Sequence, residues 1–178
     1  MPSKHSHHRI VRLCAVVAAG WVGSASVMAE RMEQKPWQLV RIPDPVARAA
    51  AIAALESAAG RLVDGECRKV LSDFANGRGQ TLADHLSSLQ VDIQSYVRMV
   101  TFIDDSRHVI CEKGGLFFTS PGSRVVRVCV EQLKRTKSRP GHLMALFIHE
   151  VLHTLGLGES PPSSEAITAR VIARCGAD

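Results

Sequence analysis

Two histidines four positions apart, inside an apolar stretch at 143–157, constrain the fold of this chain more than any other feature. The stretch contains His149-Glu150-Val151-Leu152-His153, which reads H-E-x-x-H. Its apolar spacing predicts a buried helix, and residues four apart on a helix lie on one face, about 5–6 Å apart at Cβ. Both imidazoles can therefore reach one metal ion. The pattern predicts a zinc (Zn2+) site with His149 and His153 as ligands and Glu150 as the general base that takes a proton from a zinc-bound water.

A wider pattern carries a family resemblance. Residues 149–159 read H-E-x-x-H-x-x-G-x-x-E, which resembles the long zinc signature of the metzincin peptidases. Glu159 stands where those enzymes have a third histidine and where snapalysin-like peptidases have an aspartate. No methionine follows Met144, so the chain lacks the downstream methionine turn of metzincins. The resemblance is therefore to compact secreted zincin metallopeptidases, and it implies hydrolysis of peptide bonds in a peptide or protein substrate.

A catalytic zinc takes three protein ligands and leaves a fourth position for water, so a third ligand is expected. Glu159 is the first choice, because Gly156 can adopt a left-handed conformation at the helix end and turn the chain back toward the metal. Glu165 is the alternative third ligand. The gluzincin peptidases, which are related to the metzincins, take a glutamate ligand from a later helix, and Glu165 lies in the first turn of the predicted C-terminal helix. In zincins an edge strand near the zinc helix also pairs with the substrate, but the sequence does not indicate which strand that is here.

The first residues predict export. Residues 1–29 combine a basic start, a short apolar run and small residues before Glu30, as a secretory signal peptide does. No later segment is long and apolar enough to anchor the protein in a membrane, so a periplasmic or secreted location is expected. Without this segment, 19 Lys and Arg face 17 Asp and Glu. A net charge this small gives no support for nucleic-acid binding.

Four cysteines remain after the signal peptide, an even number that predicts two disulfides in an exported protein. The expected pairs are Cys111–Cys129 and Cys67–Cys175. The first would join two strands of one antiparallel sheet, where neighbouring Cβ atoms lie close enough for a bridge. The second would tie an early helix to the last helix.

The remaining pattern predicts an α+β fold with a compact zincin-like domain at 44–178 after an extended lead-in at 30–43. Proline, glycine and capping residues place helices at 45–62, 66–75 and 81–89, the zinc helix after Pro140-Gly141, and a C-terminal helix at 163–175. Short segments rich in Val, Ile and Phe predict a small antiparallel meander at 97–103, 107–111, 116–119 and 124–130. The charged segment 131–139 is expected to be a solvated connection.

The function expected first is that of a monomeric zinc-dependent peptidase. The alternatives are a non-enzymatic exported protein with a structural zinc site and a secreted toxin or effector protease. A fourth protein ligand would favour a structural site, since such sites are closed. His85, Tyr96, His108 and Arg124 are candidates for stabilising an oxyanion or donating a proton, and the sequence favours none of them.

Overall fold

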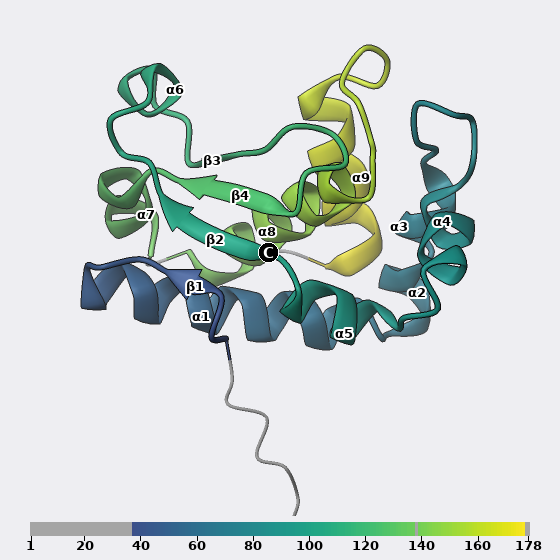
Figure 1. The fold of residues 1–178 in the computed structure, drawn as a ribbon, viewed down its shortest axis with the longest axis horizontal. Helices are drawn as coiled ribbons and strands as arrows, with labels where there is room; N and C mark the ends of the chain where they lie inside the picture. Colours follow the sequence, from purple (N-terminus) through teal and green to yellow (C-terminus); the bar gives the residue numbers. More distant parts are fainter. Residues whose placement is uncertain (1–36, 138, 177–178) are drawn as a thin grey trace, which may run out of the picture. The chain divides into compact units, whose positions relative to one another are not determined.

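The structure is a computed structural model that describes residues 37–137 and 139–176. The predicted signal peptide and the first part of the lead-in lie outside this range. The described residues form the expected α+β fold (Figure 1). The helices are α1 (Pro45–Arg61), α2 (Gly65–Arg68), α3 (Val70–Asp73), α4 (Leu82–Ser88), α5 (Ile93–Arg98), α6 (Val109–Glu112), α7 (Val130–Thr136), α8 (Pro140–Thr154) and α9 (Ser164–Cys175). The strands are β1 (Val40–Arg41), β2 (Thr101–Asp104), β3 (Phe117–Phe118) and β4 (Val125–Val128).

The four-stranded sheet has the order β1-β2-β4-β3, and it is mixed rather than antiparallel. β1 and β4 both run parallel to β2, and only β3 pairs with its neighbour β4 in the antiparallel sense. The predicted meander is therefore wrong. A meander requires each strand to pair with the next one along the chain, whereas here α6 and β3 intervene between the paired strands β2 and β4.

One predicted strand, at 107–111, is instead the short helix α6. His108 caps it, because its Nδ1 accepts a hydrogen bond from the backbone N–H of Ile110 at 3.2 Å. Similarly, the first part of the strand predicted at 97–103 belongs to α5, where Asp92 accepts from the N–H of Ser95. A side chain that caps a helix satisfies free amides at its start and can outweigh the strand preference of valine and isoleucine.

The segment expected to be a solvated connection at 131–139 contains most of α7. Val130 and Leu133 are buried on its inner face while most of its charged side chains remain in contact with water. The spacing of three residues between Val130 and Leu133 is typical of a helix. The many charged residues of the segment favoured the interpretation as a solvated connection instead.

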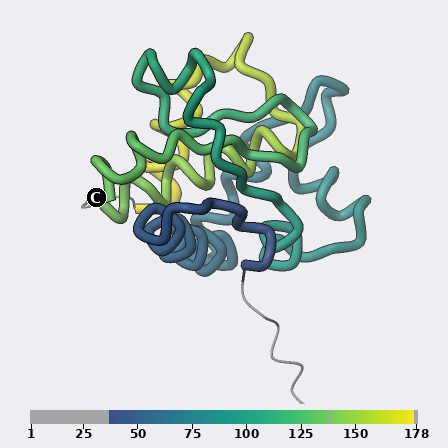
Figure 2. The backbone as a smooth tube through the Cα atoms, turned by 60° about the vertical axis from the view of Figure 1, so that its left-hand side comes forward, coloured from purple at the N-terminus to yellow at the C-terminus, as the bar shows by residue number. Residues whose placement is uncertain are grey.

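The core lies between α1, α8 and the sheet. Asp44 caps α1 by accepting a hydrogen bond from the N–H of Ala47 at 2.8 Å, and Pro45 occupies the first helical position, as the sequence indicated. Buried alanines recur on one face of α1, at positions 47, 51, 54 and 58, and they allow α8 to approach closely. Figure 2 views α1 nearly along its axis, with the segment of β1 beside it.

Both disulfides join the cysteines that the sequence paired. Cys67 in α2 bonds to Cys175 at the end of α9. Cys111 bonds to Cys129, but the reason given for this pair was wrong: Cys111 lies in α6 rather than on a strand, and Cys129 follows β4. Disulfides of this kind are typical of an oxidising compartment. Among the described helices, none is long and apolar enough to cross a membrane.

Candidate metal centre

Three side chains that the sequence singled out converge at the end of α8. The Nε2 atoms of His149 and His153 lie 2.8 Å apart. Oε1 of Glu159 lies 3.1 Å from Nε2 of His153 and 3.4 Å from Nε2 of His149. Both imidazoles are buried, whereas the Glu159 side chain is about half exposed. Three donor atoms that point at one place form a group that could hold a metal ion.

The remaining ring nitrogens are held by other parts of the chain. Nδ1 of His149 lies 2.9 Å from Oγ1 of Thr168 in α9, and Nδ1 of His153 lies 2.7 Å from the carbonyl oxygen of Leu157. Contacts at Nδ1 fix the ring orientation and leave Nε2 for a metal, which is the usual arrangement around metal-binding histidines. The sequence pointed to neither contact, because it offers no pattern that relates Thr168 or a backbone carbonyl to the motif.

The turn after α8 brings Glu159 to the histidines. Gly156 has φ +101°, a left-handed conformation that side-chain-bearing residues rarely adopt, and the chain reverses there. A Cβ at this position would also lie 3.1 Å from Cβ of Asn76. The conformation expected of Gly156 is therefore present. Glu165 in the first turn of α9 is exposed and does not belong to the group of donor atoms.

Electrostatics favour the neutral form of the first histidine. Burial, followed by the charge of His153, lowers the pKa of His149 to about 4, although Glu159 acts in the opposite direction. A neutral imidazole keeps its lone pair, which metal binding requires. At neutral pH this ring can therefore act as a ligand without first losing a proton.

Glu150 lies beside the group with a carboxylate that has too few partners. Its side chain is buried, and Oε2 accepts no hydrogen bond from the described residues. Burial, followed by the negative charge of Glu159, raises the pKa of Glu150 to about 8. A cation held by the neighbouring donors would favour the carboxylate and lower this pKa again. The unsatisfied oxygen therefore fits a site that contains a metal ion and its water.

A cleft opens over the group. One cavity of about 430 Å³ is bounded by the histidines, both glutamates, Pro121, and residues of β3 and α6. A smaller cavity of about 210 Å³ continues from it between β3, α8 and α9. β3 is at the edge of the sheet, and Phe117 and Phe118 contribute to the wall of the cleft. An extended chain in the cleft would lie along this edge strand.

The four oxyanion candidates do not line this cleft. Tyr96 is buried, and its hydroxyl lies 3.2 Å from Oγ1 of Thr154. With His85 and Arg124 it borders a separate cavity. His108 packs against the ring of Phe118, with 4.4 Å between the ring centroids.

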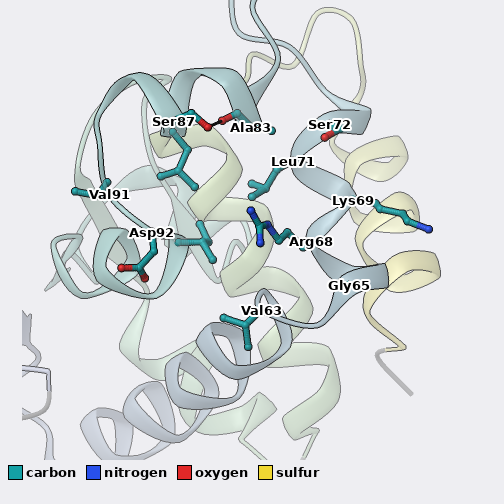
Figure 3. Close-up of a pocket in the computed structure, with 12 residues that line it drawn as sticks. Val63, Gly65, Arg68, Lys69, Leu71, Ser72, Ala83, Ser87, Val91 and Asp92 are labelled. Carbon is teal, nitrogen blue, oxygen red and sulfur yellow. Dashed lines mark hydrogen bonds between the residues drawn. The ribbon is translucent and has the colours of Figure 1, made fainter.

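A further cavity of about 510 Å³ lies between α2, α3, α4 and α5, away from the metal group (Figure 3). Arg68 points into it, and Asp92 at its border caps α5 through Ser95. Its lining includes none of the three donor residues.

Comparison with known proteins identifies no family for this chain. No protein-family model matches it, and neither a curated protein nor a solved structure is significantly similar to it. The geometry of the site is that of a His-His-Glu group able to hold a metal ion.

Proposed function

We propose that this protein is an exported zinc-dependent peptidase in which His149, His153 and Glu159 hold the metal and Glu150 is the general base. The observation that carries the proposal is the Glu150 carboxylate, which is buried beside the three donor atoms and has an oxygen without a partner among the described residues. Burying a carboxylate without partners is costly, so such a group indicates a partner of functional importance.

The donor set fits zinc. Two imidazoles and one carboxylate are the ligands of many catalytic zinc sites, and the fourth position stays open for water or substrate. When bound, zinc polarises a carbonyl group and lowers the pKa of water. Glu165 lies outside the group, so the arrangement supports an open site rather than the closed structural site that was the alternative.

The residues of the chain divide the remaining work. Glu150 takes a proton from the attacking water and passes it to the leaving amine, a role that suits a buried carboxylate that lines the same cavity as the three donor residues. Thr168 and the carbonyl of Leu157 hold the two imidazoles in place. The edge strand β3 binds an extended peptide by strand addition, and Phe117 offers it an apolar contact. The substrate is therefore a peptide or an unfolded segment of a protein, and one chain suffices to form the site.

The test is metal content and hydrolysis of an unfolded protein by the purified protein, with and without a chelator. Glu150→Gln should retain the metal and lose hydrolysis by about 10²–10⁴-fold, because an amide cannot accept the proton of the water. Glu165→Gln is the matched control, since it removes a nearby exposed carboxylate outside the group, and it should hydrolyse normally. Full turnover by metal-loaded Glu150→Gln would remove Glu150 from the mechanism.

A further inference from the structure

The separate cavity bordered by Tyr96, His85 and Arg124 has a volume of about 430 Å³ and a basic lining. It lies next to the cleft over the His-His-Glu group, which is called the metal cleft below. Arg78, Arg124 and His85 border it, together with Asn76 and Tyr96, and no aspartate or glutamate is among its lining residues. Among the described residues, neither arginine forms an ion pair within 4.0 Å. Asp84, next to His85 in sequence, accepts a hydrogen bond from Thr81 at 2.6 Å and does not line the cavity.

The cavity adjoins the metal cleft through a shared wall. Pro121 borders both cavities, and the N–H of Gly122 donates to the carbonyl oxygen of His153 at 2.8 Å. On the other side, Thr154 directly follows the second histidine and lines the basic cavity. The loop after β3 thus lies between the two cavities: Thr119 and Pro121 line the cleft over the histidines, and Pro121 and Gly122 line the basic cavity.

Arg124 is held against an aromatic ring. The guanidinium of Arg124 lies over the ring of Tyr96, 5.6 Å from its centroid. That ring is buried, and its hydroxyl is tied to α8 through Thr154. Contact with an aromatic face restricts the arginine while leaving its N–H groups free to bind an anion.

Arg78 belongs to a tight turn held by Asn76, whose side-chain oxygen accepts hydrogen bonds from the backbone N–H groups of Arg78 and Gln80. Asn76 also packs closely against Gly156 at the end of α8. The ring beneath Arg124 and the turn that carries Arg78 therefore both contact α8 or the turn that follows it.

We infer that this cavity is an anion-binding subsite that recognises a carboxylate of the peptide whose scissile bond lies at the metal. The inference rests on the proposed function and adds a substrate class to it, namely peptides with a carboxylate a few residues from the cleaved bond. Two arginines and a histidine without a competing acid offer a favourable potential to such a group. The carboxylate belongs either to an acidic side chain or to the free end of the peptide.

The test measures binding separately from hydrolysis. The Glu150→Gln protein is titrated against labelled peptides, and binding is measured by fluorescence anisotropy. The titrations are made once with zinc and once with a chelator. One peptide carries glutamate and is compared with its glutamine counterpart, and each is made with a free and with an amidated C-terminus. A preference lost with glutamine identifies the side chain as the source of the carboxylate, and a preference lost on amidation identifies the terminus.

Arg124→Gln and Arg78→Gln should each weaken binding of the preferred peptide about two- to fivefold, as expected for ion pairs reached by water. They should leave binding of the uncharged peptide unchanged, and Arg124→Lys should restore part of the preference. Arg48→Gln is the matched control, because Arg48 is exposed on α1 and does not line the cavity. Added salt should reduce the preference by screening.

Two results would overturn the subsite: equal binding of all four peptides, or a preference that persists when both arginines are replaced. The fate of the peptidase proposal is read separately from cleavage by the unmodified protein. Carboxylate-dependent binding without cleavage would retain the subsite and reject the peptidase, whereas cleavage without any carboxylate preference would do the reverse.

Discussion

Replacement of Thr168 by valine should weaken metal binding although Thr168 is not a ligand. Valine has nearly the same shape, so packing of α9 is preserved while the contact between Oγ1 and Nδ1 of His149, at 2.9 Å, is lost. The ring is only 4% exposed, so water cannot readily replace that contact. An unsatisfied buried polar group costs about 1–3 kcal/mol, and the part of this cost that applies only to the metal-bound state weakens the affinity, by at most about 150-fold. Loss of an outer partner of a metal-binding histidine typically costs about 10–100-fold, within the same range.

The measurement is competition for zinc with a chromogenic chelator, using the unmodified protein, Thr168→Val and Thr168→Ser. Serine keeps the hydroxyl and should bind zinc nearly as tightly as the unmodified protein. Thermal unfolding of the metal-free proteins establishes that the variants still fold and measures how much of the lost contact is felt without metal. If Thr168→Val binds zinc as tightly as the unmodified protein, α9 does not support the metal centre in the way described.

Three other perturbations follow from the contacts of the site and of α9. Glu159→Ala should weaken zinc binding far more than Glu165→Ala in the same chelator competition, since only Glu159 lies with the histidines; the reverse ranking would identify the other glutamate as the ligand. Replacing both Cys67 and Cys175 by alanine removes a disulfide that closes a loop of 108 residues. Denaturant unfolding should then show a loss of stability of up to about 4.7 kcal/mol, and zinc binding should be weaker. Unchanged zinc affinity would mean that the disulfide does not position α9. Hydrogen bonds from Arg174 in α9 lower the pKa of the Asp73 carboxyl in the folded protein. The stabilisation from this pair is therefore present above the unfolded-state pKa of about 3.9, and it is lost as the pH falls through the lower folded-state pKa. Asp73→Asn should reduce the loss of unfolding free energy at acid pH, and an identical pH dependence in the variant would show that the pair does not contribute.

Patterns that depend on neighbours in sequence predicted the structure well. The proline and aspartate at the start of α1, the threonine that caps α4 and the serine that caps α9 all act as expected. The metal motif also belongs to this class, because helical spacing alone places His149 and His153 on one face. Glu159 could be added to this motif from the sequence, because a local change of backbone direction at Gly156 is enough to bring residue 159 back to the helix.

Strand pairing depends on distant partners, and there the sequence was less informative. β2 and β4 are apolar enough to be recognised as strands, but nothing in either segment specifies that they run parallel. Residues 107–111 combine strand-forming side chains with a histidine that caps a helix, and the cap decides the outcome. The pairing of Cys111 with Cys129 survives this error because a disulfide needs only proximity of two Cβ atoms, which a helix turn beside a strand end supplies as well as two strands do.

The role of α9 shows why the surroundings of the site could not be predicted from the motif. Its sequence indicates an ordinary amphipathic helix, with Ile167 and Val171 on the buried face. Thr168 directly follows Ile167 in the sequence. The packing that buries Ile167 turns Thr168 toward α8, where its Oγ1 contacts His149. The orientation of α9 is fixed by contacts far from that point: the disulfide to α2, and the guanidinium of Arg61, which donates to the carbonyl of Cys175. A change at the far end of α9 can therefore reach the His-His-Glu group through a single hydroxyl, and zinc affinity, rather than stability alone, is the quantity in which that coupling should appear.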